Sequence, residues 1–148
     1  MAGIYRSVQR APREDRRFGS ARAALALRKL ADLDERITRR RTMADRLKSL
    51  LPGSVKPQSL VDCANPNYYF FIATVPDPPD ALRRHLLRHG FDAGIREEIA
   101  DDCASFLGYG DCPNARAVHS QAIHLPLHEG MSDAVIERLA DLLRARYA

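Results

Sequence analysis

Histidine is the residue type in this chain that most invites a metal-binding interpretation, because five are present. His124 and His128 are four residues apart, but Pro126 interrupts the predicted strand between them, and on a strand that spacing separates them by roughly 13 Å. His85 and His89 share one face of a predicted helix, yet the sequence ties no third ligand to them. We therefore interpret them as helix-surface histidines and predict no metal site.

A cysteine nucleophile is the second chemistry to consider. Cys103, Asp102 and His119 have the residue types of a nucleophile set, but nothing in the sequence orders them, so a core or loop cysteine is favoured. The three cysteines form no Cys-x-x-Cys pair, which favours reduced thiols in a cytoplasmic protein. The sequence also lacks a Gly-rich phosphate loop. It thus predicts a scaffold without catalytic residues of its own.

The composition predicts one soluble domain. The 148 residues are 45% hydrophobic and 28% charged, which is ordinary for a globular protein with a core. The sequence has no run of about 18 apolar residues, so we predict no membrane span. The arginines near the N-terminus have no apolar block behind them, so we expect no secretory signal. A cytoplasmic location follows.

Basic residues concentrate in the first third of the chain. Residues 1–51 hold 14 Lys and Arg against 6 Asp and Glu, a balance of +8, and the remainder carries the −4 that gives the total of +4. This part of the chain faces either an anionic partner or only solvent. Few aromatic residues lie among the arginines of residues 1–18, so the residues give little support to nucleic-acid binding by this arm.

The densest run of aromatic and β-branched residues, Asn67–Val75, predicts the central strand. Pro66 precedes it and Pro76 follows it, so the run is about one strand long. Both of its faces are apolar, which is typical of an inner strand covered on each side by helices.

A long amphipathic helix is predicted before this strand, over residues 20–51. Ser20 is its expected N-cap, and Pro52-Gly53 end it. Alanine and leucine recur along one face at three- and four-residue steps. The arginines that we expect on the outer face are Arg36, Arg39, Arg40 and Arg41.

The remaining elements complete an α+β fold, with a small sheet of about three strands covered by helices and led by the long N-terminal helix. In the second half, the buried stripe of one helix is expected to contain three leucines. The predicted elements are a short strand at 59–61, a helix from Pro79 to the C-cap Gly90 with Leu82, Leu86 and Leu87 buried, a short strand at 91–95, a helix at 113–121, a strand at 122–127, and a last helix after Met131-Ser132.

Three stretches follow one another in the chain: an arginine-led helix, a tyrosine strand with its following helix, and a closing Leu-Pro-Leu segment. They are Arg17–Leu30 with Arg40-Arg41, Asn67–Phe70 with Gly90-Phe91, and Cys112–Ala115 with Ile123–His128 and Met131-Ser132. In this order they resemble the C-terminal small domain of the DegT/DnrJ/StrS aminotransferases, over about residues 13–147. These are pyridoxal-phosphate enzymes of the aspartate-aminotransferase fold, and many act on nucleotide-linked keto-sugars.

The resemblance implies the C-terminal portion of a pyridoxal-phosphate-dependent aminotransferase, present as a truncated chain. In the family, the lysine that binds the cofactor covalently lies in the large domain, and none of Lys29, Lys48 and Lys56 matches it. The chain alone is therefore expected to be inactive. The assembled enzyme would use the cofactor for amino transfer on a nucleotide-linked keto-sugar or a similar small keto substrate. Residues 1–18 would be a basic arm from the joining segment, and residues 19–148 the small domain.

The resemblance also suggests roles for five residues. Arg17 would lie near the cofactor phosphate or the dimer seam. Asp15 occupies the position of a family asparagine that reaches the cofactor phosphate across the dimer. Asn67, Tyr69 and Arg96 would lie near the substrate mouth.

The expected partner is a second copy of the chain or a missing large-domain portion, bound through the helix at 20–51. The expected ligand is a small-molecule substrate, with no nucleic acid and no membrane. Two alternatives of other classes remain open. One is a non-catalytic interaction module that uses the same helix, and the other is a basic nucleic-acid-binding protein.

Overall fold

The computed structural model describes residues 19–61, 64–95, 102–108 and 112–147. The chain divides into two compact units, Met1–Arg36 and Ile37–Ala148. The predicted arm, residues 1–18, lies outside the described residues and stays a prediction. No helix within the described ranges is long and apolar enough to cross a bilayer.

The predicted helix of residues 20–51 is two helices, α2 (Ser20–Ala31) and α3 (Leu33–Leu50). Asp32 lies between them with φ −99° and ψ 8°, and its carbonyl accepts the Arg36 N–H at 3.1 Å. Aspartate favours helix ends over helix interiors because its side chain competes for backbone hydrogen bonds. The prediction of one continuous helix is therefore wrong.

Helix α2 has no buried residue. Its leucines Leu25, Leu27 and Leu30 are 54%, 69% and 60% exposed. Its N-cap is Gly19, which forms no side-chain hydrogen bond, so the prediction of Ser20 as the cap is wrong. The alanine and leucine stripe of this helix thus forms a surface of the first unit.

The second unit is built on a four-stranded antiparallel sheet in the order β1-β2-β4-β3. The sequence predicts about three strands, and the fourth is β1. Residues 59–61 form no strand, so the short strand predicted there is wrong, and β1 lies just before that position. The strands are β1 (Lys56–Pro57), β2 (Phe71–Thr74), β3 (Gly94–Ile95) and β4 (Ala122–Leu125).

Strand β2 is an inner strand, as predicted, although it begins later than expected. Phe71 pairs with Leu125 and Ala73 pairs with Ile123, and all four side chains are buried. Strand β4 ends immediately before Pro126, since proline has no N–H for the sheet. The sheet therefore has one buried face built from its two central strands.

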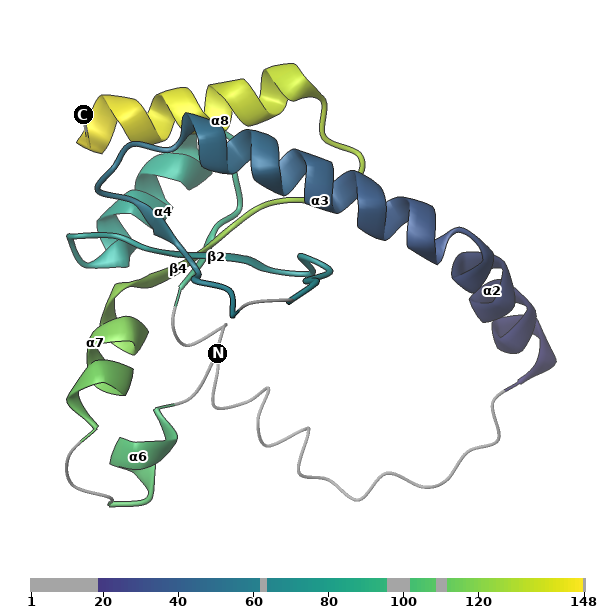
Figure 1. Ribbon diagram of the computed structural model, residues 1–148, viewed down its shortest axis with the longest axis horizontal. Helices are drawn as coiled ribbons and strands as arrows, with labels where there is room; N and C mark the ends of the chain where they lie inside the picture. Colours follow the sequence, from purple (N-terminus) through teal and green to yellow (C-terminus); the bar gives the residue numbers. More distant parts are fainter. Residues whose placement is uncertain (1–18, 62–63, 96–101, 109–111, 148) are drawn as a thin grey trace. The chain divides into compact units, whose positions relative to one another are not determined.

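Three helices pack on this face: α3, α4 (Pro79–Arg88) and α8 (Asp133–Tyr147). Figure 1 shows them on the same side of the sheet. Among the described residues of the unit, the other helices are α6 (Cys103–Phe106) and α7 (Pro113–Gln121), and α7 has the predicted bounds. The helices contribute these residues to the core: Met43, Ala44 and Leu47 from α3, Leu82 and Leu86 from α4, and Ile136, Leu139, Ala140 and Leu143 from α8.

Helix α4 ends at Arg88 with His89 as its C-cap, so the prediction of Gly90 as the C-cap is wrong by one residue. Gly90 has a φ of +85°, and the Phe91 N–H donates to the Leu86 carbonyl at 2.9 Å, which closes the helix end. Leu82 and Leu86 are fully buried, but Leu87 is 55% exposed. The prediction that all three leucines are buried is thus wrong for Leu87.

The opposite face of β2 is covered less well. Ile72 and Thr74 are half-buried, and Phe70 is 46% exposed. The prediction that helices cover both faces is wrong, because α3, α4 and α8 all pack on the side of Phe71. An apolar run by itself does not distinguish a strand buried on both faces from one with a partly open face.

Arg40 is buried, contrary to the prediction that it lies on the outer face of α3. It precedes Met43 by three residues and Ala44 by four, so it lies on their face of the helix. Its Nε is 3.9 Å from Glu129 Oε2. Arg39 is exposed, as predicted.

Candidate functional site

A cavity of about 500 Å³ lies beside the start of β2. Small-molecule sites have volumes of about 300–1,000 Å³ and mostly apolar walls with a few polar groups. The walls of this cavity are largely apolar and aromatic, and Lys48 contributes an ammonium group. The cavity is lined by Lys48 of α3, by Pro57, Gln58 and Leu60, and by residues 66–72.

The loop before β2 is bound to α3 by Arg41. The Nε–H of Arg41 donates to the Pro66 carbonyl at 2.8 Å, and its Nη2 donates to the Asn65 carbonyl at 3.1 Å. Within the loop, Asn67 Oδ1 accepts the Tyr69 backbone N–H at 3.0 Å, a turn that asparagine side chains favour. Because this amide is bonded locally, it is not available to extend β2 toward Asn67.

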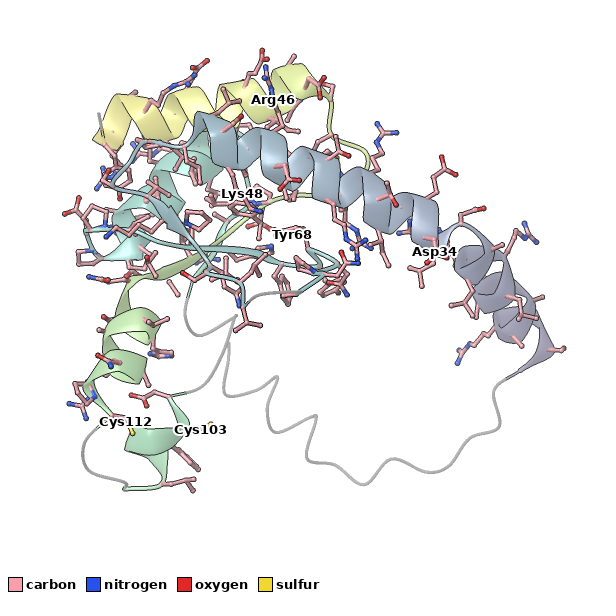
Figure 2. The ribbon with its side chains drawn as sticks, viewed as in Figure 1. Asp34, Arg46, Lys48, Tyr68, Cys103 and Cys112 are labelled. Atoms are coloured by element: carbon pink, nitrogen blue, oxygen red, sulfur yellow. The ribbon has the colours of Figure 1, made fainter. Side chains whose placement is uncertain are left out.

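Tyr68 is strained. It is the one non-glycine residue with a positive φ, 46°, in the described part of the chain, and such a conformation costs on the order of 1–3 kcal/mol. Its ring packs against the core and stacks on Phe71, with centroids 6.0 Å apart. Lys48 Nζ donates to the Tyr68 hydroxyl at 2.5 Å and lies 4.8 Å from the ring centre. Figure 2 shows both side chains beneath α3.

The Lys48 ammonium is held in its charged form. Burial lowers the pKa of Lys48, but its hydrogen bonds to Tyr68 and Asp45 raise it by more, so the net pKa is above the ordinary value. The bond to Asp45 is 3.0 Å long. A lysine that attacks an aldehyde must first lose this proton. Lys48 is therefore suited to hold the loop and not to act as a nucleophile.

Tyr69 and Phe70 present aromatic surface at the cavity. Tyr69 is 68% exposed. The two rings meet edge to face at 4.7 Å, and the Phe70 ring meets the His124 ring at 4.5 Å. Ring arrangements of this kind offer apolar contact area in a defined geometry. The cavity can thus bind and orient a small molecule.

Asn67 and Tyr69 are the predicted site residues that line this cavity. Their role as substrate contacts stays a prediction. Arg17, Asp15 and Arg96 lie outside the described residues. The predicted cofactor contacts and the third substrate contact therefore stay predictions too.

The sequence did not lead us to predict Lys48, Tyr68 and Arg41 as residues of the site. Arg41 and Lys48 are seven residues apart in α3, about two helical turns, so they lie on one side of the helix. That spacing was visible in the sequence. The sequence did not show that the 65–69 loop contacts this side of α3, because the contact joins residues more than 20 positions apart in the chain.

His85 of α4 and His89, the C-cap of that helix, share a helix face, as predicted, with ring centroids 4.6 Å apart. Burial lowers the pKa of His85, and the nearby His89, Arg146 and Arg88 lower it further. The positive charges of Arg146 and Arg88 oppose a metal ion at the pair. Among the residues that the structure describes, no three His, Cys, Asp or Glu side chains are grouped as metal ligands.

Cys103 begins α6 and is exposed, and Cys112 is exposed directly before α7. Both thiols are free. The prediction that Cys103 lies in the core or in a loop is therefore wrong, because Cys103 lies on a short surface helix. Cys63 lies outside the described residues.

The lysines of this chain do not suit covalent attachment of a cofactor. Lys29 and Lys56 are exposed on α2 and β1, whereas Lys48 is protonated and bonded to Tyr68. A nucleophilic lysine needs a lowered pKa, usually from enclosure or neighbouring cations.

The fold and cavity define an α+β domain with a ligand-sized site, and comparison with known proteins gives its family. Residues 14–144 match the DegT/DnrJ/EryC1/StrS aminotransferase family, and the chain belongs to this family. A similar curated protein is the dTDP-4-dehydro-2,3,6-trideoxy-D-glucose 4-aminotransferase of Saccharopolyspora spinosa, 29% identical over 123 residues, which cover 80% of this chain and 32% of that protein. The resemblance inferred from the three stretches is confirmed.

Solved structures confirm the α+β fold. The aminotransferase TlmJ from Streptoalloteichus hindustanus has a TM-score of 0.71 and 26% identity over 84% of this chain and 35% of its own. A DegT DnrJ EryC1 StrS aminotransferase from Brucella abortus has a TM-score of 0.75 and 20% identity, over 94% of this chain and 40% of its own. The chain thus spans about a third of the length of the relatives that it matches.

Proposed function

We propose that this chain is the C-terminal small-domain portion of a pyridoxal-phosphate-dependent aminotransferase. The family match over residues 14–144 is the observation that carries the proposal. The similar protein of Saccharopolyspora spinosa is named for amino transfer to a dTDP-linked sugar. The substrate class that we infer is accordingly a nucleotide-linked keto-sugar or a similar small keto compound, handled in the cytoplasm.

The cofactor of the proposed enzyme is pyridoxal phosphate, which supplies the electron sink for amino transfer. Solved structures of Spr1654 from Streptococcus pneumoniae include a PLP form and a PMP form, which supports this cofactor for the family. The lysines described above do not fit its covalent attachment. In this proposal the chain binds and orients the substrate through Asn67, Tyr69 and Arg96, while Arg17 and Asp15 lie toward the cofactor phosphate.

The partner that we propose is a second copy of this chain or a large-domain portion, bound through the two helices of residues 20–50. The exposed leucines of α2 support this proposal, because apolar surface of this kind marks interaction sites. Sedimentation measures the self-association of the chain. A clean monomer that binds no apolar dye would count against an exposed apolar surface that mediates association.

The test of the function is a hybrid enzyme. The region of the Saccharopolyspora spinosa aminotransferase that matches this chain is replaced by residues 14–144 of this chain. We expect the hybrid to retain pyridoxal phosphate and to convert it to the pyridoxamine form when an amino donor is added, with the unaltered relative as the control. A folded hybrid that holds the cofactor without this absorbance change would contradict the proposal.

A non-catalytic interaction module is the second candidate, favoured by the unsuitable lysines and the exposed α2 stripe. Both candidates predict that the free chain keeps no pyridoxal phosphate after borohydride reduction, since no lysine is suited to hold it. The hybrid separates them, because an interaction module would not support amino transfer in it. A salt-dependent shift of the free chain with nucleic acid would instead favour the third class.

A further inference from the structure

The direction of Tyr69 departs from the pattern of a strand. In a continuous strand Tyr69 would share the face of Phe71, since alternate residues lie on one side. Phe71 is 1% exposed and Tyr69 is 68% exposed. The alternation is broken before β2, next to Tyr68 with its positive φ. Tyr69 therefore lies at the cavity and not in the core, beside Phe70, which alternation already places on the face opposite Phe71.

A strained residue keeps its conformation only when the surrounding contacts hold it. Two side chains of α3 provide such contacts, one just before Tyr68 and one at Tyr68 itself. Arg41 binds the Asn65 and Pro66 carbonyls before it, and Lys48 binds the Tyr68 hydroxyl. The link from Lys48 to Tyr68 joins residues 20 positions apart, so it ties the loop to the helix.

We propose that Lys48 and Arg41 are positioning residues of the candidate site, which hold the 65–69 loop so that Tyr69 and Phe70 face the ligand. This proposal rests on the proposed function, because it takes the cavity as the place where substrate binds. Neither side chain needs to touch the reacting atoms. Their effect is to fix the aromatic surface before the ligand arrives, which lowers the ordering cost of binding.

The charge and length of Lys48 both matter to this role. Its ammonium bonds to the Tyr68 hydroxyl and to Asp45, and only the first of these bonds reaches the loop. Lys48→Met keeps most of the side-chain length and removes both bonds. Lys48→Arg keeps a cationic donor and should restore the loop. Tyr68→Phe keeps the ring against the core and removes only the hydroxyl.

The first measurement is nuclear magnetic resonance of the full chain, with Lys29→Met as the matched control on α2. The wild type should show a proton contact between the Phe70 and His124 rings, whose centroids are 4.5 Å apart. Lys48→Met and Tyr68→Phe should weaken that contact while the urea midpoint changes little, and Lys48→Arg should restore it. Retention of the wild-type contact in both Lys48→Met and Tyr68→Phe would overturn the proposal.

The second measurement is binding of thymidine diphosphate to the same proteins, followed through the Tyr69 and Phe70 resonances. We expect Lys48→Met to weaken binding by at least about tenfold, because small misplacements of positioning groups have large effects, and Lys48→Arg to recover most of it. Wild-type affinity in Lys48→Met would also overturn the proposal. If the wild type itself does not bind the probe, the proposed ligand of the cavity fails, while the ring contact still decides whether Lys48 positions the loop.

Discussion

The two faces of β2 show how differently neighbouring residues of one apolar run are used. Phe71, Ala73 and Val75 are at most 2% exposed beneath three helices. On the other face, Phe70 is 46% exposed, and Ile72 is half-buried beside the cavity. The first face accounts for the stability of the unit. The second carries apolar side chains that the unit does not need for its own core, which is typical of a surface used for binding.

The largest effect should come from truncating the covered face. Phe71→Ala should lower the free energy of unfolding by about 3–5 kcal/mol, the usual range for a buried phenylalanine. That is a large part of the roughly 5–15 kcal/mol available to a domain. Phe70→Ala is the matched control one residue away, and we expect a cost below about 1 kcal/mol because its ring is half exposed. Urea titration measures both, and equal costs would remove the distinction between the faces.

An intermediate effect is expected on α3, where Arg40 and Arg39 repeat the same contrast. Arg40→Ala should lower the free energy of unfolding by about 1–2 kcal/mol, because the buried stem of its side chain packs beside the core. Arg39→Ala should change it by no more than about 0.5 kcal/mol, since the side chain is exposed. The measurement is the same urea titration. An unchanged free energy of unfolding in Arg40→Ala would show that burial of this arginine does not contribute to stability.

A smaller effect is expected from pH at the end of α4. The pKa of His85 is lowered in the folded chain, first by burial and then by His89, Arg146 and Arg88. The unfolded chain therefore binds more protons than the folded chain below the ordinary pKa of about 6.5. The stability from neutral His85 is complete above that pH and is lost as the pH falls through the lowered pKa.

The variant that tests this effect is His85→Gln. The free energy of unfolding should fall less steeply in His85→Gln than in the wild type as the pH is lowered from about 6.5 toward 5. The buried Nε2 of His85 has no hydrogen-bond partner among the residues that the structure describes, so a proton added there would be poorly stabilised. Identical slopes in the two proteins would contradict this explanation.

Local patterns in the sequence predicted the parts of the fold that depend on them. Proline and glycine signals placed α7 and, to within two residues, the end of α4, and periodicity placed Leu82 and Leu86 in the core. The buried position of Arg40 was also readable, since it lies on the stripe of Met43 and Ala44. It was assigned to the outer face because arginine is seldom buried.

The candidate site was only partly predictable. Asn67 and Tyr69 came from the family resemblance and do line the cavity. Lys48 and Tyr68 could not be paired from the sequence, because their contact depends on how α3 crosses the loop. The strain at Tyr68 was hidden as well, since a tyrosine in a run of aromatic residues is typical of a strand and gives no sign of a positive φ.

The open face as a binding surface is the central claim, and Tyr69→Ala in the hybrid enzyme tests it most directly. The measurement compares the rate of amino transfer and the urea midpoint of hybrids with and without this change, with Lys29→Met as the control. Because Tyr69 is 68% exposed, we expect an unchanged midpoint and a lower rate at limiting substrate. An unchanged rate at every substrate concentration would show that the aromatic side chain at the cavity does not take part in substrate binding.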